Sequence, residues 1–97
     1  MQARLILYRK RYYDDGAILE VTLWQVPGQV RGSSHKLKYS LFYGYAGFRL
    51  IGYDNEAGKG DHRHYGDREE RYLFQTAQRL VDDFLADVRR LREAGYG

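Results

Sequence analysis

Strand patterns separated by short turn sequences fill the first half of this chain. In the second of them, Leu19, Val21 and Leu23 face one side, and the residues between them face the other. Asp14-Asp15-Gly16 supplies a hairpin turn because Asp-Gly tolerates the positive φ angles that such turns require, and Pro27 ends the second strand. The pattern predicts four strands, at residues 3–13, 17–26, 37–45 and 48–54.

A helical pattern replaces the strand pattern near the end of the chain. Thr76 is a suitable N-cap, and Gly95 stands where glycine often ends a helix. The apolar residues between them fall on one stripe at helical spacing: Leu80, Val81, Phe84, Leu85, Val88 and Leu91. Before the helix, Glu70 to Phe74 could add a short fifth strand.

Strands joined by short connections pair in antiparallel fashion. We therefore expect an α+β fold, in which an antiparallel sheet of four to five strands carries one C-terminal amphipathic helix packed across one face. Residues 1–97 form a single domain in this interpretation, with a β-rich part at 3–74 and the helix at 76–94. A helix is about 10 Å wide, whereas four strands at about 4.8 Å spacing span nearly twice that width. The uncovered sheet, with Trp24 and several of the ten tyrosines, is expected to meet a partner.

The composition excludes several classes of protein. The 97 residues include no cysteine, so neither disulfides nor thiolate metal sites can form, and a reducing compartment is expected. No apolar stretch approaches the roughly 20 residues of a membrane span, and the N-terminus lacks the pattern of a signal peptide. We therefore expect a cytoplasmic protein without a membrane partner. Residues 1–51 carry eight Lys or Arg against three acids, which favours a polyanionic partner.

The segment from Tyr53 to His64 is rich in ionisable residues and holds two of the three histidines. If its backbone is extended, His62 and His64 point to the same side, with their Cα atoms roughly 7 Å apart. That separation suits a general base and a general acid on opposite sides of a scissile phosphate, because imidazole is matched to both roles near neutral pH. In metal-independent RNA cleavage, the base takes the proton of the 2′-hydroxyl and the acid protonates the leaving 5′ oxygen. Lys59 and Arg63 would neutralise the charge that develops on the phosphate.

Other interpretations of the ionisable residues stay open. Asp61, His62 and His64 have the ligand chemistry of a zinc, nickel or manganese site. The histidines could instead be satisfied by backbone carbonyls in a structural loop, and the acids could hold arginines in surface ion pairs. Near the N-terminus, Arg9 and Arg11 could grip an RNA backbone while neighbouring tyrosines stack on bases.

The histidine segment also carries a family resemblance. Its most specific part is the run Gly52-Tyr53-Asp54-Asn55-Glu56 and then Gly58-Lys59-Gly60-Asp61-His62-Arg63-His64, with Glu69-Glu70 and Tyr72-Leu73-Phe74 after it. With these residues the chain resembles the TumE family of bacterial and archaeal toxins. The resemblance implies the toxin half of a type II toxin–antitoxin module, neutralised by a cognate antitoxin that is usually a helix-turn-helix protein. It also implies a functional site made of Asp54, Lys59, Asp61, His62, Arg63, His64 and Glu70.

We therefore expect a metal-independent endoribonuclease toxin that binds RNA and needs no cofactor. His62 and His64 would share the base and acid duties. A carboxylate would orient one imidazole, and the candidates are Asp54, Asp61 and Glu70. The expected substrate-binding residues are Lys59, Arg63, Arg9, Arg11 and Tyr53. The alternatives are a non-catalytic module that binds RNA, the ribosome or an antitoxin, and a metal-dependent nuclease; a homodimer is compatible with either.

Overall fold

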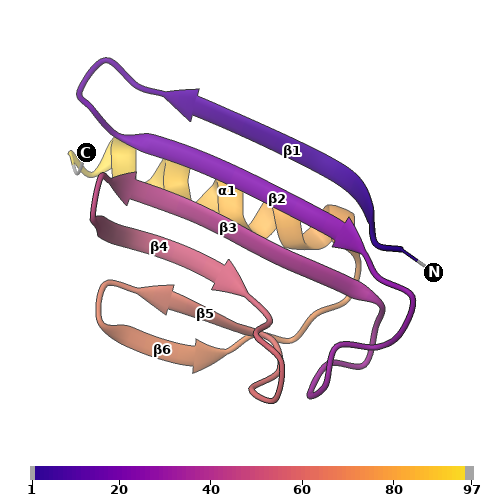
Figure 1. The fold of residues 1–97 in the computed structure, drawn as a ribbon. Helices are drawn as coiled ribbons and strands as arrows, with labels where there is room; N and C mark the ends of the chain where they lie inside the picture. Colours follow the sequence, from indigo (N-terminus) through magenta and orange to yellow (C-terminus); the bar gives the residue numbers. More distant parts are fainter. Residues whose placement is uncertain (1, 96–97) are drawn as a thin grey trace.

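The computed structural model describes residues 2–95 and contains six β-strands followed by one α-helix. The elements are β1 (Arg4–Tyr12), β2 (Ile18–Gln25), β3 (Leu37–Tyr45), β4 (Phe48–Asp54), β5 (His62–Tyr65), β6 (Arg68–Arg71) and α1 (Ala77–Glu93). All neighbouring strands are antiparallel, and their order in the sheet is their order in the chain (Figure 1). The expected architecture, one C-terminal helix on an antiparallel sheet, is confirmed.

The sheet has six strands, not the four to five that the sequence predicts. The difference lies around the histidines, where β5 and β6 form a hairpin in place of a loop and a strand at 70–74. Each of these strands is four residues long: β5 has the sequence His-Arg-His-Tyr, and β6 consists of Arg and Glu alone, so neither shows an apolar alternation. Their strand structure comes from pairing with β4 and with each other.

Helix α1 has the caps that the sequence indicates. The Thr76 side chain accepts a hydrogen bond from the backbone N–H of Arg79 at 3.0 Å, and Gly95 follows the helix with a φ of +90°. The apolar stripe of the helix packs on a core drawn from alternate positions of the central strands: Leu19, Val21, Leu23, Tyr39, Leu41, Tyr43, Ile51 and Tyr53. Within residues 2–95, no helix has the length and apolar content needed to cross a membrane.

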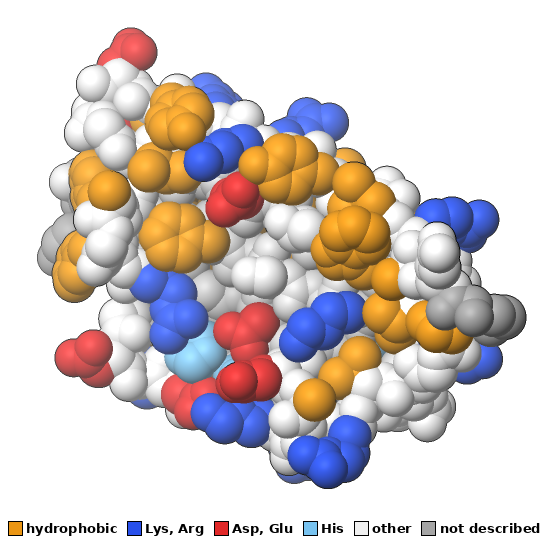
Figure 2. Space-filling model, viewed as in Figure 1, with side chains coloured by type: hydrophobic (Ala, Val, Ile, Leu, Met, Phe, Trp, Pro, Cys, Tyr) orange, Lys and Arg blue, Asp and Glu red, His pale blue; other side chains and the backbone are white. Residues whose placement is uncertain are grey.

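Alternation along the strands gives the sheet two different faces. Helix α1 covers one of them, and we call the other the open face; Figures 1 and 2 look onto the open face, with the helix behind the sheet. On the helix side, the buried Asp87 of α1 accepts hydrogen bonds from the hydroxyls of Tyr53 and Tyr65 and forms an ion pair with Arg90. This carboxylate ties the helix to β4 and β5.

The loops after β2 and β4 lie side by side at one end of the sheet (Figure 1). The backbone N–H of Gly58 donates to the carbonyl of Arg31 at 2.7 Å. The side chain of the fully buried Asn55 accepts from the backbone N–H of Tyr39 at 2.9 Å and donates to the carbonyl of Leu37 at 2.6 Å. These contacts fix the start of β5, on which His62 and His64 lie.

Exposed apolar and aromatic side chains gather on the first strand and extend over the open face (Figure 2). They include Leu5, Tyr8 and Tyr12 of β1 and Trp24 of β2. Strand β1 also forms one edge of the sheet. Exposed apolar surface next to a sheet edge is typical of a site where another chain binds.

Candidate functional site

His62 and His64 lie side by side on β5 and face away from α1. Their ring centroids are 5.1 Å apart, with an angle of 77° between the ring planes. In the β4–β5 register, His62 is opposite Asp54 and His64 is opposite Gly52. His62 is 6% exposed, and the side chain of His64 is 13% exposed. The two rings therefore share the open face but are recessed among neighbouring side chains.

Two carboxylates bracket the imidazole pair. Asp54 Oδ1 lies 2.9 Å from His62 Nε2, and Asp54 Oδ2 lies 3.5 Å from His64 Nε2. Glu69 Oε2, from β6, lies 3.2 Å from His62 Nε2 and 3.7 Å from His64 Nε2. We call Asp54, His62, His64 and Glu69 the histidine cluster. Its two ring Nε2 atoms converge on the same two carboxylates.

A backbone carbonyl orients the ring of His62. The Nδ1 atom lies 3.0 Å from the carbonyl oxygen of Gly60. Because that oxygen can only accept a hydrogen bond, Nδ1 must carry the hydrogen. The Nε2 atom on the other side of the ring points towards Asp54 and Glu69.

Arg49 approaches the cluster across the open face. Its Nη1 lies 4.0 Å from Oδ2 of Asp54. Burial lowers the pKa of His64, and the charge of Arg49 lowers it further, against the opposing effect of Asp54 and Glu69. The net effect favours neutral His64, the form that can accept a proton or bind a cation.

Basic side chains also lie beside the cluster. A depression next to it is lined by Lys59, Asp61, His62, Glu69, Glu70 and Arg71. Arg71 is opposite His62 in the β5–β6 register, and the exposed Lys59 pairs with Glu56 at 3.6 Å. Figure 2 shows histidine surface on the open face between acidic and basic side chains. The lining therefore combines two cations, Lys59 and Arg71, with three acidic residues and the imidazole of His62.

Asp61 belongs to a different cluster, although it precedes His62 in the chain. Its carboxylate accepts hydrogen bonds from the hydroxyls of Ser33 at 2.6 Å and Tyr39 at 2.7 Å. The Nε2 atom of His35 lies 2.7 Å from the same carboxylate. Burial opposes the negative charge, but these hydrogen bonds outweigh it and hold the pKa of Asp61 below its ordinary value. Asp61 thereby joins the two loops to each other, away from the imidazole pair.

Arg63 and Glu70 point to the opposite face, towards α1. Glu70 accepts a hydrogen bond from Nε of Arg63 at 2.7 Å. The guanidinium lies 6.0 Å from the ring centre of Tyr53 and 5.5 and 5.7 Å from those of Tyr65 and Tyr72. Burial opposes its charge, yet the hydrogen bonds to Glu70 and Tyr53 raise the pKa of Arg63. Tyr53 itself is 1% exposed, so this group of residues forms part of the packing between sheet and helix.

Arg9 and Arg11 lie at the other edge of the sheet, on β1. Arg9 lines a groove with Val81 and Leu85 of α1, which places it on the helix side. The guanidinium of Arg11 lies 4.3 Å from the ring centre of Tyr13. The structure therefore does not bring either arginine to the histidine cluster.

Glu69 and Arg49 are residues of the site that the sequence interpretation does not single out. A signal for Glu69 exists: the two-residue turn Gly66-Asp67 joins β5 to β6 and sets Glu69 opposite His64. Assigning residues 62–65 to a strand would have predicted this pairing. No comparable signal marks Arg49, because its path depends on the space above Gly52.

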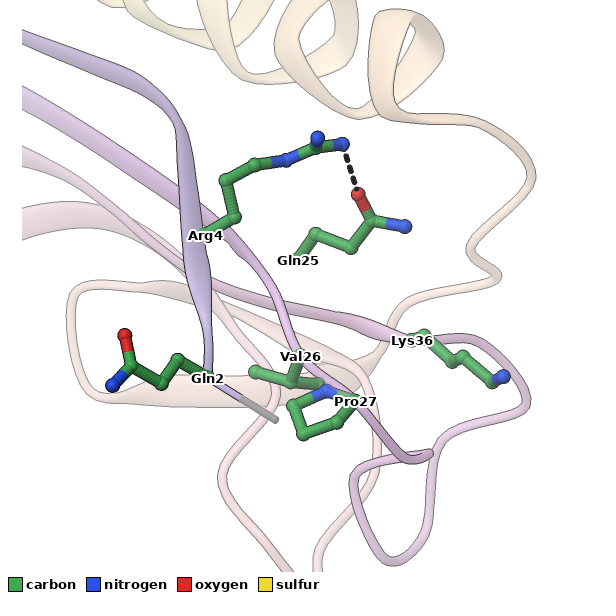
Figure 3. Close-up of a pocket in the computed structure, with 6 residues that line it drawn as sticks. All are labelled: Gln2, Arg4, Gln25, Val26, Pro27 and Lys36. Carbon is green, nitrogen blue, oxygen red and sulfur yellow. Dashed lines mark hydrogen bonds between the residues drawn. The ribbon is translucent and has the colours of Figure 1, made fainter.

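A second depression, at the end of β1 and β2, lacks comparable chemistry (Figure 3). Its lining residues are Gln2, Arg4, Gln25, Val26, Pro27 and Lys36. Arg4 donates a hydrogen bond to Gln25 at 2.7 Å, and the side chains spread around the depression instead of converging (Figure 3). Both ionisable residues among them are basic, so the depression offers no acid–base pair.

The fold and the histidine cluster together define a small α+β protein with a histidine–carboxylate site on the uncovered face of a six-stranded meander. The family model described as "Toxin TumE" matches residues 2–92, and the chain belongs to this toxin family. The resemblance seen in the sequence is confirmed, and membership implies an antitoxin partner. Neither curated proteins nor solved structures gave a match to the chain.

Proposed function

We propose that this toxin is an endoribonuclease whose reaction takes place at the histidine cluster. One observation supports the proposal above all others. The Nε2 atoms of His62 and His64 lie 2.9 and 3.5 Å from the Asp54 carboxylate and 3.2 and 3.7 Å from that of Glu69. Paired imidazoles with carboxylate partners are suited to the proton transfers of phosphodiester cleavage.

RNA carries its own nucleophile in the 2′-hydroxyl group. When a base removes its proton, the oxygen attacks the adjacent phosphorus, and the 5′ oxygen leaves after it receives a proton. The products end in a 2′,3′-cyclic phosphate and a 5′-hydroxyl. In the metal-independent form of this reaction, one imidazole would take the first proton and the other, as imidazolium, would supply the second. Asp54 and Glu69 would orient the rings.

The basic residues next to the cluster support an anionic substrate. Arg49 lies 4.0 Å from the Asp54 carboxylate, and Lys59 and Arg71 line the depression next to His62. Each of these cations could neutralise charge on a phosphate as it develops. Because Arg63 and Tyr53 pack towards the helix, the geometry favours these cations for substrate binding.

Growth and cleavage assays test the proposal. His64→Ala, expressed without antitoxin, should restore growth, and the purified variant should cleave RNA at least about 100-fold more slowly than the parent. His62→Ala should have the same effect. Gln78→Ala, on the exposed side of α1, is the control and should keep parental activity. Folded His64→Ala protein that cleaves RNA at the parental rate would refute the proposed site.

A non-catalytic RNA-binding role is the second candidate function. The exposed tyrosines of strand β1 favour this role. Tyr8 is 52% exposed and Tyr12 is 68% exposed, on a strand at the sheet edge. Tyrosines next to basic residues can stack on bases while the cations bind phosphates. Purified protein that binds RNA with strong salt dependence but leaves it intact would favour this role.

We also propose a helix-turn-helix antitoxin as the cytoplasmic partner. The edge of β1 would accept an added strand of that antitoxin or of a second copy of this chain. The reading frame next to the gene identifies the antitoxin. Size-exclusion chromatography of the purified toxin, alone and with the antitoxin, distinguishes a homodimer from a toxin–antitoxin complex.

A further inference from the structure

The orientation of His62 brings three electron-rich atoms together. The carbonyl of Gly60, 3.0 Å from Nδ1, fixes the ring hydrogen on that side. The Nε2 atom of the same ring faces Asp54 Oδ1 at 2.9 Å and Glu69 Oε2 at 3.2 Å. Two carboxylate oxygens and one ring nitrogen therefore converge on one point, where either a hydrogen on Nε2 or a bound cation would hold them together.

The nitrogen–oxygen separations in the histidine cluster are compatible with a metal site. A tetrahedral zinc ion bound at about 2.0–2.1 Å holds its donor atoms about 3.3 Å apart. The nitrogen–oxygen separations in the cluster, 2.9, 3.2, 3.5 and 3.7 Å, bracket that value. The donor atoms of Asp54, His62 and His64 all lie within 4.8 Å of one another.

We propose that the histidine cluster binds one divalent transition-metal ion through Nε2 of His62, Nε2 of His64 and the carboxylates of Asp54 and Glu69. Two imidazole nitrogens with two carboxylate oxygens suit zinc or manganese, whereas calcium and magnesium prefer oxygen ligands alone. The sequence-based metal alternative uses Asp61. In the structure the Asp61 carboxylate contacts Ser33 and Tyr39, and Asp54 lies next to the imidazoles instead.

The surroundings of the cluster suit a metal centre. The Gly60 carbonyl holds the far side of the His62 ring, an arrangement that fixes the tautomer of metal-bound imidazoles. The four ligands come from three adjacent strands, β4, β5 and β6, whose pairing sets their relative positions. Arg49, 4.0 Å from Asp54, and the depression beside Glu69 would let an anionic substrate approach the ion.

What the ion does rests on the proposed ribonuclease function, but whether it binds does not. A bound ion would polarise a phosphoryl oxygen and stabilise the charge that develops on it. His62 and His64 would then act as ligands, and metal-dependent cleavage would replace their acid–base roles.

Metal binding by the purified full chain tests this inference. Protein treated with a chelator and desalted is titrated with Zn²⁺ by calorimetry and with Co²⁺ by visible absorption. We expect one ion per chain and the absorption of tetrahedral Co²⁺. His64→Ala and Asp54→Asn should each weaken Zn²⁺ binding by at least about tenfold. Glu70→Gln is the matched control, because Glu70 follows Glu69 in the chain but faces Arg63, and it should bind Zn²⁺ like the parent.

Cleavage assays with and without chelator separate this inference from the ribonuclease proposal. Binding that both variants weaken, with cleavage that stops on chelation, supports both. Folded parent protein that binds no ion and cleaves RNA in chelator overturns the metal site and leaves the ribonuclease proposal intact. Stoichiometric binding without RNA cleavage supports the metal site and overturns the ribonuclease proposal. Binding that His64→Ala and Asp54→Asn leave unchanged places the ion elsewhere and overturns the site.

Discussion

Gly52 lies directly opposite His64 in the antiparallel pairing of β4 with β5. A Cβ atom at Gly52 would lie 2.6 Å from Cδ of Arg49. The absence of a side chain therefore lets Arg49 run flat along the open face towards Asp54. A residue with no chemistry of its own determines where a cation lies next to the imidazole pair.

Gly52→Ala should lower the RNA-cleavage rate about tenfold, because the new methyl group would displace Arg49 and weaken the contact that we propose between Arg49 and the substrate phosphate. Stability should change little, since the position needs no positive φ and the displaced group is a flexible side chain. Cleavage kinetics and thermal unfolding measure the two effects. Gly28→Ala is the control, because a Cβ there meets nothing within 4 Å. Full activity in both Gly52→Ala and Arg49→Ala would show that Arg49 has no role.

Glu69→Gln should reduce RNA cleavage about 10- to 100-fold, because it removes a charged partner of both imidazoles. Glu70→Gln should cost at most about 1 kcal/mol of unfolding free energy, because its pair with Arg63 is 31% and 38% exposed. Growth inhibition and urea unfolding compare the two variants. Equal losses of activity would contradict the assignment of these neighbours to opposite faces.

Asp61→Asn should lower the free energy of unfolding by about 2–4 kcal/mol, because an amide cannot accept all the hydrogen bonds that the carboxylate receives from Ser33, His35 and Tyr39. The variant should keep its cleavage rate wherever it stays folded. Urea unfolding at neutral pH gives the stability, with the exposed turn residue Asp67→Asn as the control. Unchanged stability together with lost cleavage would place Asp61 in the active site.

Tyr53→Phe should destabilise the protein by about 1.5–3 kcal/mol, because its hydroxyl donates to the buried carboxylate of Asp87. RNA cleavage by the folded variant should not change, since Tyr53 faces the helix. Tyr12→Phe, at a position that is 68% exposed, should shift stability by no more than about 0.5 kcal/mol. A stable Tyr53→Phe protein with impaired RNA binding would instead support the sequence-based role of Tyr53 as a substrate contact.

The first four strands and the helix can be predicted because their local patterns agree with the surroundings that they meet in the fold. Leu19, Val21 and Leu23 alternate in the sequence and are buried on one face in the structure. The β5–β6 hairpin could not be recognised in this way. Its strands carry ionisable residues on both faces, so pairing with β4, and not local apolar alternation, makes them strands.

From the sequence alone, strand alternation could predict only which residues of β5 share a face of the sheet. A spacing of two residues puts His62 and His64 on one face, and the same rule turns Arg63 to the other. Which residues lie beside the pair depends on the register between strands. For that reason only the structure shows Glu69 and Arg49 beside the imidazole pair, and only the structure shows that the Asp61 carboxylate bonds to Ser33 instead.

Because chain order and sheet order coincide, each strand can pair with its predecessor soon after it leaves the ribosome. The exposed edge strand, with Tyr8 and Tyr12, is therefore made early, whereas His62 and Glu69 emerge much later. We therefore expect the edge of β1 to form in the nascent chain before the histidine cluster does. On our proposal that the antitoxin binds the edge of β1, an antitoxin already present would bind the nascent toxin before the histidine cluster forms.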